Sequence, residues 1–111
     1  MDIRFRTRRL AKTFNAFVDL ERFYGAQMAK AIIKRMAVLK NAPHLGLVPP
    51  TKPDRRHQLS GNKHEQFAVD LIHPHRLVFK PNHDPIPRKK DGGIDLEHVT
   101  AIMILKVVDY H

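Results

Sequence analysis

Residues 66–80, with the sequence QFAVDLIHPHRLVFK, carry the clearest signal of the fold. Apolar side chains recur at every second position in residues 66–72 and again in residues 76–80. The members of this apolar face are Phe67, Val69, Leu71, Leu77 and Phe79. A period of two predicts strands that are buried on one side, and Pro74 ends the first of them. We therefore expect two adjacent antiparallel strands here.

Further strands are expected on both sides of this stretch. Residues 55–60 alternate in the same way, and the turn residues Ser-Gly-Asn-Lys at 60–63 follow them, so the three segments predict an antiparallel meander. Residues 99–109 are apolar on both faces as far as Leu105, which predicts a central strand. Residues 1–5 alternate and predict a short N-terminal strand.

The first half of the chain carries helical signals. Thr7 is expected to cap a helix at residues 8–15, and Asp19 to cap a long helix at residues 20–40. The apolar stripe of the long helix is Ala29, Ile32, Ile33, Met36 and Leu39. Its basic residues, expected on a solvated face, are Lys30, Lys34, Arg35 and Lys40. Gly25 either permits close packing or marks a break in this helix.

The order of these elements is β-α-α-β-β-β-β. It predicts an α+β fold in which an N-terminal strand and two helices pack on a mainly antiparallel sheet. The chain of 111 residues has no internal repeat and no linker, so residues 1–111 are expected to form a single domain. A proline-rich loop and a polar loop at residues 83–93 connect the elements.

The composition of the chain limits the classes of function that this protein can have. Twenty Lys and Arg against eleven Asp and Glu give a net charge of +9, which predicts a polyanionic partner, most often nucleic acid. Solubility alone, or an acidic protein partner, are the alternatives. Cysteine is absent, which excludes disulfides and thiol catalysis and agrees with a cytoplasmic location. No apolar run approaches a membrane helix and no secretory signal is present, so no membrane partner is expected.

Generic catalytic and metal motifs are missing. The sequence contains no P-loop, GxGxxG, HExxH or GxSxG pattern. Among eight histidines, His73 and His75 flank a proline with His83 beyond, a weak metal spacing that no cysteine or carboxylate pair completes. We expect neither a native metal nor a cofactor.

The last predicted strand ends in an unusual trio, Asp109, Tyr110 and His111. On a strand, Asp109 and His111 share one face and Tyr110 points to the other. At a strand end the twist relaxes, so all three could reach a common cleft. The alternative is a frayed polar terminus.

Four segments occur in a defined order: RHQLSG at 56–61, QFAVDL at 66–71, RLVF at 76–79 and DYH at 109–111. Together they resemble the HigB-like killer protein branch of the RelE/ParE toxin superfamily. Residues 24–39 also resemble the second helix of that family. The resemblance covers nearly the whole chain and implies the RelE-like α+β fold.

The resemblance implies a function as well. Toxins of this branch belong to type II toxin–antitoxin pairs, enter the ribosomal A site and cleave mRNA there, so ribosome and mRNA are the implied partners. A cognate HigA-like antitoxin with a helix-turn-helix domain holds such a toxin inactive. Operator DNA would be bound only through the complex with the antitoxin.

The resemblance also implies site residues. His57, Arg76 and the terminal trio match the family's functional positions. Ser60 departs from the pattern, because some HigB toxins carry a lysine before the glycine, and Lys63 across the turn could supply the missing charge. The alternatives are a core role for His57 and a structural pair between Arg76 and Asp70.

Cleavage of RNA without a metal needs a base for the 2′-hydroxyl proton, a cation for the phosphorane and an acid for the 5′-oxygen. We assign His57 and His111 to the acid–base pair, in either order, since a histidine titrates near neutral pH. Arg76 suits the phosphorane. Asp109 would orient an imidazole or act as base, and Tyr110 would stack on or hydrogen-bond the substrate. The products would be a 2′,3′-cyclic phosphate and a 5′-hydroxyl.

The basic segments would bind phosphates of rRNA and mRNA without sequence preference. The candidates are Arg8, Arg9, Lys52, Arg55, Arg56, Lys63, Arg88, Lys89 and Lys90. Three other functions stay open: a ParE-like toxin that targets gyrase, a catalytically inactive RNA- or ribosome-binding protein of the same fold, and a module that binds an acidic protein.

Overall fold

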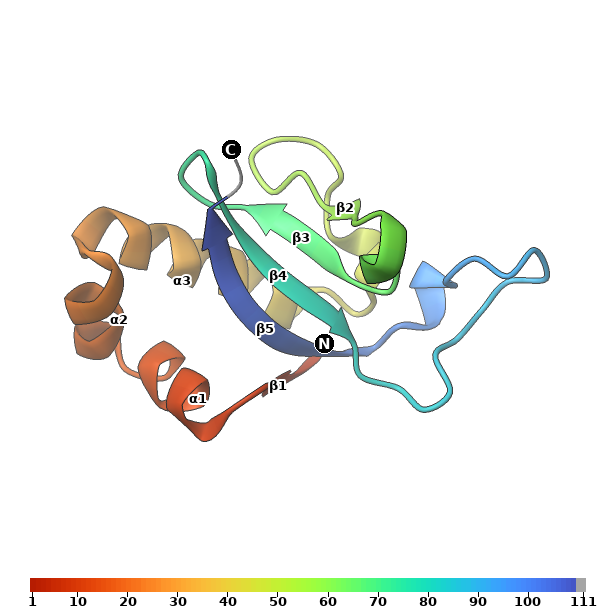
Figure 1. The fold of residues 1–111 in the computed structure, drawn as a ribbon, viewed down its shortest axis with the longest axis horizontal. Coiled ribbons are helices and arrows are strands. Elements are labelled where there is room, and N and C mark those ends of the chain that lie inside the picture. The colour runs from red at the N-terminus through yellow and green to blue at the C-terminus, as the bar shows by residue number, and fades with distance from the viewer. Residues whose placement is uncertain (110–111) are drawn as a thin grey trace.

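The alternating stretch forms the expected hairpin, with strands β3 (Phe67–Asp70) and β4 (His75–Pro81) paired antiparallel. In the computed structural model, which describes residues 1–109, they belong to a five-stranded sheet of order β1-β5-β4-β3-β2 (Figure 1). The central position of β5 (Ala101–Asp109), between β1 (Asp2–Phe5) and β4, confirms the interpretation of its apolar run. Only the β1–β5 pair of the described strands is parallel.

Three helices occur in the described residues instead of the two expected. Helix α1 (Arg8–Phe14) begins after Thr7, whose Oγ1 accepts a hydrogen bond from the Leu10 amide at 3.1 Å, as predicted. Helix α2 (Phe17–Tyr24) and helix α3 (Ala26–Asn41) replace the single long helix.

Gly25 separates α2 from α3. Its φ of 88° lies in the left-handed region, which an α-helix cannot include and which glycine adopts without a steric penalty.

Asp19 is not the cap that the sequence predicted. Ala16 is the residue before α2, and Asp19 lies in the first turn of that helix. The carboxylate is still favourably placed there, near the positive end of the helix dipole.

The hydrophobic core lies between α3 and one face of the sheet. Helix α3 contributes Ala29, Ile32 and Leu39, all fully buried, while Ile33 of the predicted stripe is 43% exposed. The sheet contributes Phe67, Val69, Leu77, Phe79, Ile102 and Ile104. We call this side of the sheet the covered face.

Two connections, residues 59–66 and 82–100, are longer than the strands they join. Strand β2 is only His57–Gln58, shorter than the predicted strand at residues 55–60, because Arg55 has a φ of 46° and interrupts the extended chain. The polar loop turns back on itself through an isolated bridge between Arg88 and Ile94 and extends away from the sheet (Figure 1). No helix in the described part of the chain has the length and apolar character to cross a bilayer.

Candidate active site

The face of the sheet opposite α3, which we call the open face, carries different side chains. Directly paired residues share a face, so the strand register defines two rows across the sheet. The first row is His57, Ala68, Val78 and Lys106, and the second is Asp70, Arg76 and Val108. Ala68 and Val78 are fully buried yet lie outside the core cluster. They give the open face a small apolar floor with polar residues on both sides.

A pocket of about 320 Å³ opens on this face. Its lining residues are His57, Gln58, Leu59, Ser60, Lys63 and Arg76. The structure thus joins three of the predicted site residues, His57, Lys63 and Arg76, at one hollow. His57 lies in the wall of this pocket and not in the apolar core.

A backbone contact determines the tautomer of His57. Its Nδ1 lies 2.9 Å from the carbonyl oxygen of Arg55. A carbonyl oxygen can only accept, so Nδ1 carries the proton and donates it to this bond. In the neutral ring, the lone pair is therefore on Nε2. That nitrogen can take a proton from a substrate group.

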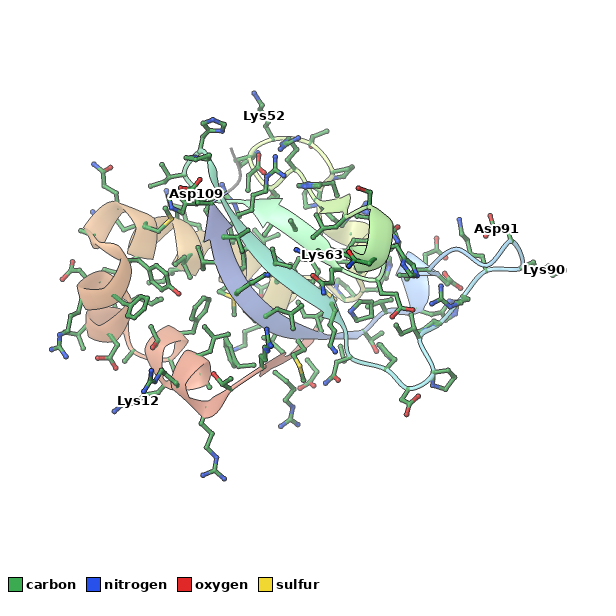
Figure 2. The ribbon with its side chains drawn as sticks, in the orientation of Figure 1. Lys12, Lys52, Lys63, Lys90, Asp91 and Asp109 are labelled. Atoms are coloured by element: carbon green, nitrogen blue, oxygen red, sulfur yellow. The ribbon has the colours of Figure 1, made fainter. Side chains whose placement is uncertain are left out.

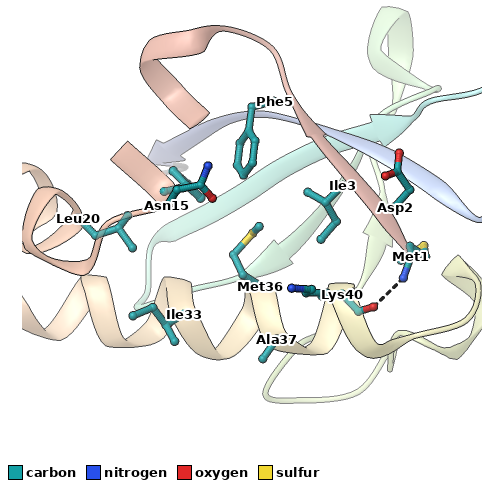
Figure 3. A pocket seen from close by; sticks show the side chains of 11 residues that line it. Met1, Asp2, Ile3, Phe5, Asn15, Leu20, Ile33, Met36, Ala37 and Lys40 are labelled. Atoms are coloured by element: carbon teal, nitrogen blue, oxygen red, sulfur yellow. Dashed lines mark hydrogen bonds between the residues drawn. The ribbon is translucent and has the colours of Figure 1, made fainter. Parts of the chain in front are cut away.

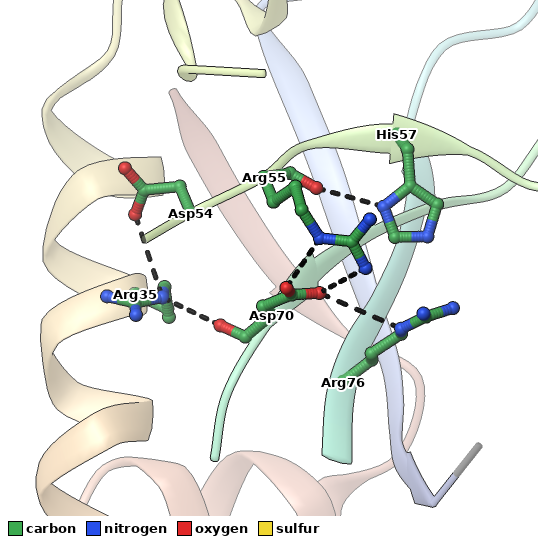
Figure 4. A network of polar contacts seen from close by, with 6 residues as sticks. All are labelled: Arg35, Asp54, Arg55, His57, Asp70 and Arg76. Carbon is green, nitrogen blue, oxygen red and sulfur yellow. Dashed lines mark hydrogen bonds and ion pairs between the residues drawn. The ribbon is translucent and has the colours of Figure 1, made fainter. Parts of the chain in front are cut away.

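Asp70 is the centre of a charged network beside the pocket (Figure 4). Its carboxylate accepts two hydrogen bonds from Arg55, at 2.7 Å from Nε and 3.2 Å from Nη2. Arg76 Nε lies 3.7 Å from Oδ1 of the same carboxylate, which is the structural pair that the sequence allowed. The hydrogen bonds and charge of Asp70 raise the pKa of the Arg55 guanidinium. The Arg55 guanidinium therefore keeps its positive charge beside the pocket.

Arg35 extends this network into the core side of the molecule. It was expected on a solvated face, but its side chain is only 12% exposed. Its Nε donates to the Asp70 carbonyl oxygen at 2.7 Å and lies 3.6 Å from Oδ1 of the buried Asp54. The expectation is wrong because the loop before β2 folds over α3 and places an acid against it.

Several predicted RNA-binding residues have structural contacts instead. Arg56 Nε donates to the Val48 carbonyl oxygen at 2.9 Å, and partial burial lowers the pKa of Arg56. Arg88 binds Glu65 at 2.6 Å, and Lys89 lies 3.9 Å from Asp91. The charges of these three residues are partly offset or used to hold loops together.

The remaining basic candidates do not line the pocket. Arg8 and Arg9 belong to α1, and Lys52 is exposed in the loop before β2. Figure 2 places Lys12 of α1 and Lys90 at opposite ends of the long axis of the molecule, which measures 45 Å. The fold therefore places the basic residues of α1 far from those of the polar loop.

The terminal trio is only partly described. Tyr110 and His111 lie outside the described residues. Asp109 is opposite His75 in the register, and its Oδ2 lies 4.0 Å from His75 Nε2. Arg76 is opposite Val108, so Asp109 points to the other face of the sheet and does not line the pocket of His57 and Arg76.

Three further residues of the open face were not among the predicted site residues. Asp70 and Lys106 lie in its two rows, and Lys80 follows Val78 by two positions on β4. Lys106 could have been noticed in the sequence, because it is a lysine inside an otherwise apolar central strand. A β-bulge hid its direction, because the register shift leaves Leu105 as an extra residue in β5 and turns Lys106 away from the face of Ile104.

A second hollow, of about 430 Å³, lies between β1 and the helices (Figure 3). Its lining is mostly apolar, with Phe5, Leu20, Ile33 and Met36. At its rim the Met1 amine donates to the Lys40 carbonyl oxygen at 2.7 Å. No histidine lines this hollow, so it lacks the acid–base groups of the pocket on the open face.

Within residues 1–109, no group of three or more His, Asp or Glu is placed to hold a metal ion. His83, one of the three histidines considered, accepts hydrogen bonds from the amides of Thr100 and Ala101 through Nε2, at 3.1 and 3.2 Å.

No family model matches this sequence, and no curated protein matches it either. Solved structures do. The chain is similar to a YoeB/ParE toxin from Agrobacterium tumefaciens, with a TM-score of 0.57 and 10% identity over 100% of both chains. It is also similar to a chain of the YoeB-YefM complex from Staphylococcus aureus, with a TM-score of 0.55 and 14% identity over 100% of this chain and 97% of that one. The protein therefore has the fold of YoeB/ParE toxins, which confirms the predicted RelE-like α+β class.

Proposed function

We propose that this protein is the toxin of a type II toxin–antitoxin pair and that it cleaves mRNA on the ribosome without a metal. The observation that carries the proposal is the pocket on the open face, where one histidine and two cations meet. The toxin fold and the net charge of +9 support it. The HigB-like branch rests on the ordered segments of the sequence.

In the proposed reaction, His57 Nε2 takes the proton of the 2′-hydroxyl. The 2′-oxygen then attacks the phosphorus, and the bond from phosphorus to the 5′-oxygen breaks. Arg76 and Lys63 balance the charge on the phosphorane. His111 gives a proton to the leaving 5′-oxygen, and Tyr110 stacks on a base. Asp109 has no role in this mechanism, because it points to the other face of the sheet and does not line the pocket. The products are a 2′,3′-cyclic phosphate and a 5′-hydroxyl.

We further propose that a cognate antitoxin neutralises the protein in the cytoplasm. The similar chain from Staphylococcus aureus was solved as a complex with a second protein, which supports a partner of this kind. Its surface should be acidic, because it must compete with RNA for the basic open face. A helix-turn-helix domain of HigA-like type would bind operator DNA, and the toxin would reach DNA only through it.

The test is to induce the protein with and without the neighbouring gene and to map mRNA 5′ ends. Treating the RNA with a kinase before ligation, or leaving it untreated, separates 5′-hydroxyl ends from 5′-phosphate ends. We expect kinase-dependent ends inside translated messages. His57→Ala should remove them, since acid–base catalysis contributes about a hundredfold to ten-thousandfold. His73→Ala, an exposed histidine outside the pocket, is the matched control.

The competing functions predict different results. A toxin that targets gyrase would arrest replication before translation and leave messages intact. A catalytically inactive RNA- or ribosome-binding protein would slow translation without new 5′ ends, and a module for an acidic protein would do neither. Intact messages during arrested growth would overturn the nuclease proposal.

A further inference from the structure

Asp70 is an unexpected residue beside a pocket that is proposed to bind RNA. Its side chain is 25% exposed, and a carboxylate at this place repels phosphate. Yet the residue is contacted from three elements: Arg55 before β2, Arg76 on β4 and Arg35 on α3. Such convergence is expected where a group holds other groups in position.

The first contact of Asp70 controls the backbone at Arg55. Arg55 has a φ of 46°, a left-handed conformation that residues with a Cβ rarely adopt. Two hydrogen bonds from its guanidinium to Asp70 hold it there, together with the bond from its amide to the Thr51 carbonyl oxygen at 2.8 Å. A backbone outlier of this kind persists only when its surroundings over-determine it.

The conformation of Arg55 has a consequence for His57. It places the Arg55 carbonyl oxygen 2.9 Å from His57 Nδ1, the contact that leaves the lone pair on Nε2. If Arg55 relaxed to an ordinary conformation, its carbonyl would turn and this contact would be lost. The chain of contacts therefore runs from Asp70 through Arg55 to the tautomer of His57 (Figure 4).

The second contact of Asp70 acts on the cation. Arg76 is directly opposite Asp70 in the β3–β4 register, and its Nε lies 3.7 Å from Oδ1. This ion pair restrains a long, flexible side chain that lines the same pocket as His57. One carboxylate thus orients two of the groups that the proposed reaction uses, His57 and Arg76.

We propose that Asp70 is a positioning residue: it holds His57 as the Nδ1–H tautomer through Arg55, holds Arg76 at the pocket, and does not itself contact RNA. The catalytic part of this inference rests on the proposed function. The effect on the tautomer does not, because it can be observed in the protein without RNA.

The test compares Asp70→Asn, which keeps the shape and removes the charge, with Asp91→Asn as a matched control. Asp91 is 72% exposed at the tip of the loop far from the pocket, and its substitution removes the same charge. Nitrogen-15 NMR of the imidazole reports the tautomer at a pH where the ring is neutral. Two further quantities are measured for each variant. They are the single-turnover rate of cleavage of ribosome-bound mRNA and the affinity for a 2′-methoxy RNA oligonucleotide.

For Asp70→Asn we expect the Nε2–H tautomer of His57 to appear and the cleavage rate to fall about tenfold to a hundredfold, since small misplacements are costly. RNA affinity should stay equal or become tighter, because the pocket loses a negative charge. A purely structural role would lower thermal stability and would not separate rate from affinity. Asp91→Asn should change none of these quantities.

Arg55→Ala keeps the inference testable if Asp70→Asn does not fold. It retains Asp70 and removes the link, so it should produce the same change of tautomer. In the double variant with Asp70→Asn, the change should be no larger than in either single variant.

A folded Asp70→Asn or Arg55→Ala protein whose His57 stays in the Nδ1–H form would overturn the inference. So would weaker RNA binding with an unchanged cleavage rate. If the wild-type protein cleaves no RNA, the proposed function fails, and the NMR comparison still decides whether Asp70 positions His57.

Discussion

The two faces of the β3–β4 hairpin carry opposite kinds of side chain on the same two strands. On the covered face, Phe67 and Phe79 are paired and their rings stack with centroids 6.1 Å apart. On the open face, Asp70 and Arg76 are paired and form an ion pair. Because side chains alternate, one short sequence supplies both the core and the pocket. Substitutions on the covered face should therefore change stability, and those on the open face should change binding and chemistry.

Phe79→Ala should have the largest effect on the covered face. Phe79 is fully buried in the core, and truncation of such a side chain costs about 3 to 5 kcal/mol in free energy of unfolding. Urea denaturation measures this change. The adjacent Lys80→Ala, which alters an exposed residue of the open face, should stay within about 0.5 kcal/mol. Similar costs for the two variants would break the distinction between the faces.

The Arg35–Asp54 pair joins the two regions and should have the next largest effect. Arg35→Met leaves the buried Asp54 carboxylate without its cation and should cost about 2 to 3 kcal/mol. The double variant with Asp54→Leu should cost less than Arg35→Met alone, since it leaves no uncompensated charge. Equal costs in urea denaturation would mean that Arg35 acts by packing rather than by its charge.

Lys63→Glu tests whether the open face or the total charge governs RNA binding. Reversing this pocket charge should weaken binding of an RNA oligonucleotide roughly tenfold at low salt. Lys90→Glu makes the same change in charge on the polar loop, outside the pocket lining, and should weaken binding less than Lys63→Glu in the same buffer. Equal losses, measured by fluorescence anisotropy, would favour a diffuse electrostatic interaction.

Lys106→Gln should have the smallest effect. It tests whether the RNA-binding part of the open face extends to Lys106. The variant keeps most of the aliphatic stem and removes one positive charge from the row of His57. The slope of log affinity against log salt should become shallower by about 0.7, the contribution of one phosphate contact. An unchanged slope would place Lys106 outside the RNA-binding surface.

Much of this architecture followed from local patterns in the sequence. The period of two in the hairpin, the apolar run of β5 and the cap at Thr7 are set by residues close together in the chain, and the structure confirms them. Gly25 was ambiguous, because the helical pattern continues through it and only its backbone conformation shows the break. His57, Lys63 and Arg76 were candidates at the level of the sequence, but their common pocket requires the strand order.

Other features depended on contacts between distant residues. Asp54 lies in a proline-rich loop, 19 residues after Arg35, and no local pattern predicts that they meet. The β-bulge at Leu105 decides which face receives Lys106, and simple alternation along β5 gives the opposite answer.

The α+β class, the covered face of the sheet and the residue types available for chemistry can be predicted from the sequence, because periodicity and turn signals act between near neighbours. The assembly of the open face depends on the folded chain. The fold paired Asp70 with Arg76 across two strands, bent the chain at Arg55 to face His57, and separated the basic segments into different surfaces. These outcomes depend on register and loop packing, which are set by residues far apart in the chain.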